Sequence, residues 1–223
     1  MSTYSGPNIV TSGLVLDLDP ADSKSFTSNT NPFIDLSPYQ TNGIIGANTV
    51  YSNLNNGILL YDGTSSNVAI SGNTAINFPN TNYTLSLWVN PNASWPAYAV
   101  FIDRTTNYFQ YRFQRASSSN VLEFFDSVYT ITGGTITTGS WNYLAVSVGG
   151  GNCTLYVNAA NVASNVCASY YGNDTIGTTY IGRYSGAGAL YMGSMGPVQI
   201  YNRKLSDNEI LQNFNAYRGR YGL

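Results

Sequence analysis

The stretch Thr84–Val89 reads Thr-Leu-Ser-Leu-Trp-Val, so that Leu85, Leu87 and Val89 fall on one side of an extended chain. Alternation of apolar residues with a period of two is the pattern of a β-strand with one buried face. The stretches 13–19 and 141–148 repeat it, the first with Leu14, Leu16 and Leu18 and the second with Leu144, Val146 and Val148. These segments predict strands that line a common core.

Further short apolar segments follow along the chain, separated by Gly, Asn, Ser and Pro residues that are typical of turns. They predict strands at 58–62, 67–71, 98–103, 108–114, 121–126, 153–157, 161–166, 178–182, 189–192 and 197–202. Many short strands with turns between them indicate an antiparallel sandwich of two sheets. No internal repeat or linker divides the sequence, so we expect one domain over residues 1–223.

One helix is predicted, at 206–217. Ser206 followed by Glu209 three residues later forms a capping box, and Leu205 with Ile210 forms a hydrophobic staple. The apolar face consists of Ile210, Leu211, Phe214 and Tyr217. Gly219 is placed to take the left-handed conformation that ends many helices. We expect this helix to close one edge of the sandwich.

The two cysteines lie on the arms of a predicted hairpin. A three-residue loop at 159–161 would place Cys153 directly opposite Cys167, close enough for a disulfide. A slip of one residue would separate them, and a reducing compartment would keep both thiols free. The sequence leaves both outcomes open.

Composition limits the partners of the chain. Of its 223 residues 14% are aromatic but only 9% are charged, and the net charge is −2. A surface of Asn, Ser, Thr and Tyr side chains hydrogen-bonds well and repels little, which suits assembly or sugar contact. The scattered basic residues form no stripe for nucleic acid. The amino terminus lacks a signal-peptide pattern and no apolar run approaches membrane-spanning length, so we expect synthesis in a cytoplasm.

Several segments together resemble the laminin-G-like, concanavalin A-like lectin/glucanase jelly-roll domains, in the form found in tailed-phage virion proteins. They are Gly13–Pro20, Phe33–Pro38, Asn42-Gly43, Leu60–Gly63, Tyr83–Pro91, Trp141–Val146, Leu155–Asn158, Val198–Ser206, Glu209–Ala216 and Arg218–Leu223. The resemblance covers nearly the whole chain in the same order, and its last segment is the most specific. It implies two curved antiparallel sheets and no particular ligand, because this fold hosts lectins, glycanases, adhesion modules and capsid decorations.

The sequence departs from these relatives at two places. The hairpin turn that usually carries Asn-Gly is Asn158-Ala159 here, and Gly196-Pro197 stands where many relatives have an acidic pair. In calcium-dependent relatives such acids help to hold the ion. Calcium remains possible through oxygen ligands, with Asp62 and Asp103 as the candidates, but the sequence does not support a metal or any other cofactor.

Catalytic chemistry has few residues available. The chain contains no histidine, which removes Ser-His-Asp and Cys-His systems. Glycoside hydrolysis needs a pair of carboxylates, but Glu209 belongs to the capping box, and Glu123 and Asp126 fall on opposite faces of a strand. Asp17 and Asp19 share a face, yet they stand at a strand end before Pro20, where turn hydrogen bonding is the ordinary role. We therefore expect no enzyme activity.

Aromatic residues in loops are the candidates for ligand binding: Trp95, Tyr98, Tyr170, Tyr171 and Tyr184. Their rings could stack on sugars or fill a protein interface, or they could pack against the end of the sandwich. The leading hypothesis is a non-enzymatic surface protein of a phage virion, a capsid decoration or a tail or fibre component, that binds other virion proteins and glycans. It would be made in the host cytoplasm. The alternatives are a stand-alone carbohydrate-binding module and, ranked last, a glycoside hydrolase.

Overall fold

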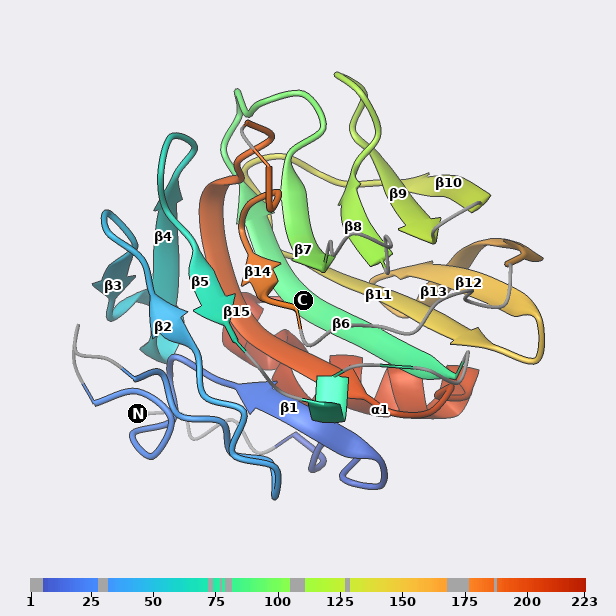
Figure 1. The fold of residues 1–223 in the computed structure, drawn as a ribbon, viewed down its shortest axis with the longest axis horizontal. Helices are drawn as coiled ribbons and strands as arrows, with labels where there is room; N and C mark the ends of the chain where they lie inside the picture. The colour runs from blue at the N-terminus through green and yellow to red at the C-terminus, as the bar shows by residue number, and fades with distance from the viewer. Residues whose placement is uncertain are drawn as a thin grey trace.

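The computed structural model describes residues 6–27, 32–71, 74–76, 78, 82–104, 111–126, 129–167, 177–186 and 188–223. Within them the chain forms two antiparallel sheets packed face to face, with one α-helix near the carboxyl terminus (Figure 1). The predicted all-β sandwich is confirmed. In the described part of the chain, no helix has the length and apolar character needed to span a bilayer.

The larger sheet has eight strands. They are β1 (Leu14–Leu18), β3 (Val50–Ser52), β4 (Ile58–Asp62), β6 (Tyr83–Pro91), β11 (Asn142–Gly149), β12 (Asn152–Val157), β13 (Ala160–Val166) and β15 (Met192–Tyr201). Their order is β13-β12-β11-β6-β15-β4-β3, and β1 pairs with β15 next to the stretch that β4 covers. Strands distant in sequence are therefore neighbours, and the sheet joins β1, near the amino terminus, to β15, near the carboxyl terminus.

The smaller sheet has seven strands. They are β2 (Ile44–Ile45), β5 (Val68–Ile70), β7 (Val100–Arg104), β8 (Tyr111–Arg115), β9 (Val121–Asp126), β10 (Tyr129–Thr135) and β14 (Thr179–Ile181), in the order β10-β9-β8-β7-β14-β5-β2. Short 3₁₀ turns occupy Leu54–Asn56, Thr74–Ile76 and Arg218–Tyr221.

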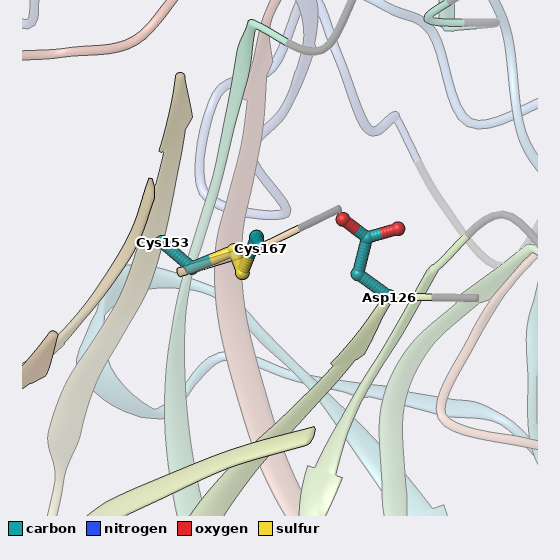
Figure 2. A group of neighbouring side chains, drawn as sticks. All are labelled: Asp126, Cys153 and Cys167. Carbon is teal, nitrogen blue, oxygen red and sulfur yellow. A yellow bond between two sulfur atoms is a disulfide. The ribbon is translucent and has the colours of Figure 1, made fainter. Parts of the chain in front are cut away.

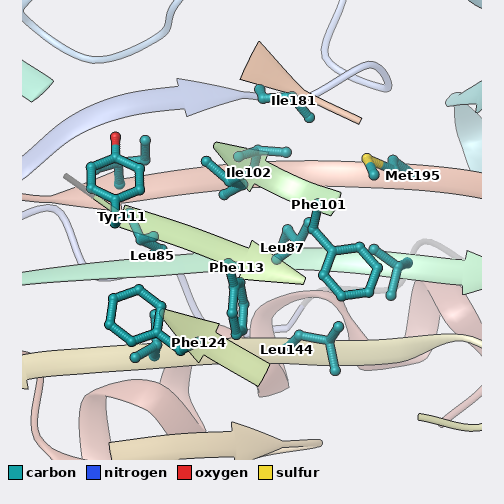
Figure 3. Packing of buried hydrophobic residues seen from close by; sticks show 14 of the residues in the cluster. Leu85, Leu87, Phe101, Ile102, Tyr111, Phe113, Phe124, Leu144, Ile181 and Met195 are labelled. Carbon is teal, nitrogen blue, oxygen red and sulfur yellow. The ribbon is translucent and has the colours of Figure 1, made fainter. Parts of the chain in front are cut away.

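The main core lies between the sheets. Leu85, Leu87 and Leu144 of the larger sheet face Phe113 and Phe124 of the smaller one, and all are fully buried (Figure 3). The predicted inward residues of 84–89 and 141–148 all belong to this core. Alternation along each strand sends the next side chain to the outer face, so the two outer faces decide what each sheet can do.

The outer face of the larger sheet, called the covered face below, lies under α1 (Asp207–Tyr217). The indole of Trp88 stacks on Phe214 with ring centroids 5.6 Å apart and on Tyr221 at 4.5 Å. Ile210 is fully buried in the same cluster, and Figure 1 shows α1 crossing the side of β6 and β15 away from β7. Aromatic burial therefore fixes the helix on this sheet.

Polar contacts hold the two ends of α1. At its start the predicted capping box is present, with Ser206 N–H donating to Glu209 Oε2 at 2.9 Å. Beyond its end, Arg220 Nη1 donates to both carboxylate oxygens of Asp19 at 2.9 and 3.1 Å, and its Nε donates to the Asn55 carbonyl. Charge-assisted bonds of this kind are stronger than neutral ones, so Arg220 ties the chain end to the loop after β1.

The end of the helix differs from the prediction. The chain continues from Tyr217 into the 3₁₀ turn, and Gly222 rather than Gly219 adopts the left-handed conformation, with φ of 76°. This extra turn brings Tyr221 onto Trp88. Leu211, predicted on the apolar face, is 46% exposed because Ile210 and Phe214 fill the contact with the sheet.

Several strand predictions also need correction. In place of the two strands predicted at 189–192 and 197–202, one continuous strand, β15, runs from Met192 to Tyr201, and its register shifts between Met195 and Val198. The shift accommodates Pro197, since proline inside a central strand requires such an irregularity. A second shift between Leu14 and Leu16 turns Leu14 into the covered face. Strands β2, β3 and β10 were not predicted because they are short, exposed or glycine-containing.

The hairpin of β12 and β13 has a tighter turn than predicted. Val157 pairs with Ala160, so the loop is Asn158-Ala159, and both residues have positive φ, 51° and 64°. This turn and a register shift between Leu155 and Tyr156 together place Cys153 opposite Asn165, so the predicted register is wrong. The register difference of two residues keeps Cys153 and Cys167 on the same face of the hairpin. They form a disulfide with Cα atoms 5.6 Å apart.

Candidate functional site

The outer face of the smaller sheet carries a group of polar and aromatic side chains, called the open face below. Ile102, Phe113 and Phe124 pair across β7, β8 and β9 and point into the core, so their strand neighbours point outward. The open face consists of Asp103, Arg112, Gln114, Glu123, Phe125 and Tyr180 on the strands, with Arg183 and Tyr184 from the segment after β14. Among the described residues, no helix packs on this face.

An ion pair lies at the middle of the open face. Asp103 and Arg112 are direct partners across β7 and β8, and Arg112 Nε donates to Asp103 Oδ1 at 2.9 Å. The other oxygen of Asp103 accepts the backbone N–H of Ser185 at 3.1 Å. The Asp103 side chain is fully buried and that of Arg112 is 18% exposed. The carboxylate therefore fixes both the guanidinium and the segment after β14.

Two tyrosines flank this ion pair, each beside a guanidinium. Arg112 lies over the ring of Tyr184 at 4.0 Å from the centroid, and Arg183 lies over Tyr180 at 4.9 Å. Cation–π contacts of this kind hold rings in place while leaving their hydroxyls near water. Both tyrosines are half-buried, so their orientation is fixed before any ligand arrives.

Polar groups continue away from the tyrosines on either side. On β8 and β9 the Gln114 amide donates to Glu123, its direct cross-strand partner. Beyond Arg183 lies a pocket of about 250 Å³ lined by Thr64, Ser65, Arg183, Gly186, Gly188 and Leu190. The open face thus presents ring surfaces, guanidinium donors, carboxylate acceptors and a shallow pocket together.

The predicted ligand-binding aromatics fall in different places. Tyr184 lies on the open face. Tyr98 is 50% exposed in the loop before β7, with φ of 55°, and its N–H donates to the Ser117 carbonyl. Tyr170 and Tyr171 lie outside the described residues. Trp95 is only 7% exposed, so its ring is a packing element.

The burial of Trp95 has a clear local cause. Its indole N–H donates to Asn120 Oδ1 at 3.3 Å, and Arg115 stacks on the ring at 4.5 Å. Arg115 also donates to the Trp95 carbonyl at 2.6 Å. The loop before β7 is thereby closed onto β8. Tyr180 and Phe125 also lie on the open face but were not predicted as candidates. Each alternates along its strand with core residues, and this alternation identifies the outer face only once the strands have been assigned to the two sheets.

Comparison with known proteins agrees with this architecture. Residues 62–211 match a family model described as the concanavalin A-like lectin/glucanases superfamily. The chain belongs to that superfamily. The matched stretch contains every strand and loop residue of the open face. No curated protein matches the chain.

Solved structures with this concanavalin A-like fold include two toxin domains and one enzyme domain. The binding domain of Paraclostridial Mosquitocidal Protein 1 matches with a TM-score of 0.74 and 18% identity over 92% of this chain and 52% of that one. The binding domain of Botulinum Neurotoxin DC in complex with SialylT matches with a TM-score of 0.69 and 16% identity, over 92% of this chain and 52% of that one. Domain 4 of an extracellular arabinanase from Geobacillus stearothermophilus, in complex with arabinotriose, matches with a TM-score of 0.70 and 16% identity, over 92% of this chain and 100% of that one. The chain spans about half the length of the two toxin structures.

Glycoside hydrolysis would need a carboxylate pair, and the acids among the described residues lie apart from the open face or are already bound by protein groups. Asp126 points into the molecule, whereas Glu123 lies outward on the same strand, as predicted. Glu209 Oε2 accepts a hydrogen bond from Arg203 Nη1 at 3.0 Å. Burial and the Arg203 hydrogen bond act in opposite directions on Glu209, and the hydrogen bond prevails, so that its pKa falls to about 2.

Asp17 and Asp19 lie on the covered side, beside a pocket of about 620 Å³ between β1, residues 6–9 and the end of α1. Asp19 is engaged by Arg220. Asp17 accepts a hydrogen bond from Gln199 Nε2 at 3.1 Å. Burial, and to a smaller extent the nearby Asp19, Asp35 and Asp22, outweigh this hydrogen bond and raise the pKa of Asp17 to about 7. One acid of the pair is thus held by a cation while the other is partly protonated near neutral pH.

The calcium candidates are both occupied by protein groups. Asp62 Oδ1 accepts backbone N–H groups from Thr64, Ser65 and Ser66 at 2.9 to 3.0 Å. Although burial acts in the opposite direction, these hydrogen bonds hold the pKa of Asp62 well below its usual range. Asp103 is bound by Arg112. The carboxylates of Asp62 and Asp103 therefore serve a turn and an ion pair.

Proposed function

We propose that the chain is a binding protein without catalytic activity, and that its open face takes a glycan. The observation that carries the proposal is the arrangement of Tyr184, Arg112 and Asp103, in which a buried carboxylate and a stacked guanidinium hold an aromatic ring on a sheet face that no described helix covers. Sugars present C–H faces and hydroxyl groups. Half-buried aromatic rings can pack against the C–H faces, and the guanidinium, amide and carboxylate groups can hydrogen-bond to the hydroxyl groups.

Preorganisation supports glycan binding over a purely structural role. A ligand that meets fixed side chains has less conformational entropy to remove, and weak sugar contacts gain most from this. Tyr180 and Tyr184 are each held by a cation–π contact, and Glu123 is held by Gln114. Two of the solved relatives were determined with carbohydrate ligands, SialylT and arabinotriose, which favours a sugar as the class of partner.

A finer proposal concerns the setting. We place the protein on the surface of a tailed-phage virion, as a capsid decoration or a tail or fibre component made in the host cytoplasm. The resemblance of the closing segments to phage virion proteins and the low charge of the chain support this. The face opposite the glycan site, or an edge of the sandwich, would contact other virion proteins.

A glycan array tests the binding proposal. The wild-type chain is expected to bind at least one glycan class, and Tyr184→Ala should reduce that signal at least about tenfold through loss of the ring contact. Tyr39→Ala is the matched control, because Tyr39 is 49% exposed and lies outside the open face. An array without binding, or equal losses for both variants, would refute the proposal.

Mass spectrometry of purified virions tests the setting separately. The chain should be present in intact particles at a fixed ratio to the major structural proteins. Its absence from particles of a phage that encodes it would overturn the virion role while leaving glycan binding to be judged by the array.

A further inference from the structure

Asp126 is a buried carboxylate at the end of β9, and it points across the sandwich toward the Cys153–Cys167 disulfide of the larger sheet (Figure 2). A carboxylate oxygen and the two sulfur atoms lie within 4.8 Å of one another, and all three residues are buried. Cys153 comes from β12, and Cys167 directly follows β13. The group therefore draws its members from both sheets.

The Asp126 carboxylate has no offsetting partner within the described residues. It is 3% exposed, and none of the hydrogen bonds or ion pairs found among the described residues involves its carboxylate. An unpaired buried carboxylate is costly, and most buried polar groups in folded proteins are satisfied. The disulfide sulfurs beside it offer no compensation for a negative charge.

Reduction changes what the three groups can do. A phosphine or dithiol reductant cleaves the S–S bond; with a phosphine, water supplies the oxygen of the phosphine oxide and the protons of two thiols. Two thiolates and one carboxylate are ligand types that zinc uses, with Zn–S distances of about 2.3 Å and Zn–O distances of about 2.0 to 2.2 Å. Ligand atoms in a tetrahedral site then stand about 3.5 to 4 Å apart, and the atoms here are within reach of that spacing after side-chain rotation.

We infer that the reduced form of the chain binds one Zn²⁺ ion through Cys153, Cys167 and Asp126. Binding displaces the two thiol protons to solvent, and the ion neutralises two of the three negative charges. A water molecule completes four-coordination, as in zinc sites with three protein ligands. A small-molecule disulfide such as oxidised glutathione can oxidise the two thiolates by thiol–disulfide exchange: the Cys153–Cys167 bond forms, the oxidant takes up two electrons and two protons and leaves as two thiols, and the ion is released. Zinc would thus connect the two sheets under reducing conditions, where the covalent link is absent. This inference is independent of the proposed glycan site.

Cobalt titration of the full chain tests this site. The protein is reduced with a water-soluble phosphine, freed of reductant under argon and titrated with Co²⁺, whose thiolate charge-transfer and visible bands report tetrahedral sulfur ligation. We expect one Co²⁺ per chain, displaced by one Zn²⁺, and no such bands in the oxidised protein. Asp126→Asn should weaken the zinc affinity at least about tenfold.

Glu123→Gln is the matched control, since it removes one carboxylate from the same strand on the opposite face and should leave the affinity unchanged. The Asp126→Asn chain retains its cysteines, so near-ultraviolet circular dichroism of its oxidised form checks that it folds. The absence of thiolate bands in the reduced wild type, or equal zinc affinities for wild type and Asp126→Asn, would overturn the inference. Loss of the bands in the Cys153→Ser, Cys167→Ser double variant would support it.

Discussion

The two outer faces of this sandwich are built from similar residues but used differently. On the covered face Trp88, Tyr143 and Phe214 pack against one another, and the helix excludes solvent from them. On the open face Tyr180 and Tyr184 contact guanidinium groups instead of other rings and stay half-buried. Aromatic content alone therefore does not locate a binding site. What distinguishes the open face is that charged groups, rather than an additional element, hold its rings.

The largest effect should come from breaking the covered face. Trp88→Ala removes a fully buried indole that stacks on Phe214 and Tyr221, and it should lower the free energy of unfolding by about 3 to 5 kcal/mol. Urea denaturation measures this loss. A decrease below about 1 kcal/mol would mean that α1 contributes little to the fold.

The covered face should also respond to pH. The folded-state pKa of Asp17, about 7, lies above its unfolded value of about 3.9, so its contribution to stability is complete below pH 4 and is lost as pH rises through 7. Asp17→Asn keeps an acceptor for Gln199 and removes the charge. It should stabilise the protein by about 4 kcal/mol at pH 8, because each pKa unit between the folded and unfolded values corresponds to about 1.4 kcal/mol, and it should have little effect at pH 4.

Thermal unfolding of the wild type and Asp17→Asn between pH 4 and pH 8 measures this difference in stability. Asp126, whose pKa burial raises to about 6, also destabilises the fold as pH rises, and it is present in both proteins. The stability of Asp17→Asn should therefore still fall with rising pH, but less than that of the wild type. Parallel curves for the two proteins would contradict the assignment to Asp17.

A change in the hairpin turn at the margin of the covered face gives a smaller effect. Ala159 occupies a turn position with φ of 64°, where a Cβ atom costs about 1 to 2 kcal/mol relative to glycine. Ala159→Gly should therefore stabilise the chain by about 1 kcal/mol without altering glycan binding. Asn158→Gly is the useful comparison, because it also removes the acceptor of the Tyr143 N–H and should be less favourable. Equal or lower stability for Ala159→Gly would argue against the tight turn.

The smallest effect on stability is expected on the open face. Tyr184→Ala removes a half-buried ring and one cation–π contact, so the free energy of unfolding should change by less than about 1 kcal/mol. Denaturation of this variant beside Trp88→Ala measures the contrast between the faces directly. A loss as large as that of Trp88→Ala would show that Tyr184 is primarily a packing residue.

The sequence predicted the elements whose signals are local. The alternation in 84–89 and the Ser206–Glu209 capping box each identified an element that the structure contains. Features that depend on the register between strands were less accessible: the turn at Asn158-Ala159 was predicted one residue too long, and β15 was predicted as two strands separated by residues 193–196. Of the candidate site, Tyr184 was predicted, but its relation to Arg112 and Asp103 depends on the register of β7 and β8.

The central claim is that ligand binds the open face and not the covered one. Hydrogen exchange of the chain with and without a glycan found on the array compares the faces within a single molecule. We predict slower exchange in β8, β9 and residues 179–186 when the glycan is bound, with no change in residues 207–221. Protection confined to residues 207–221 or to β1, with none in β8 and β9, would contradict the account.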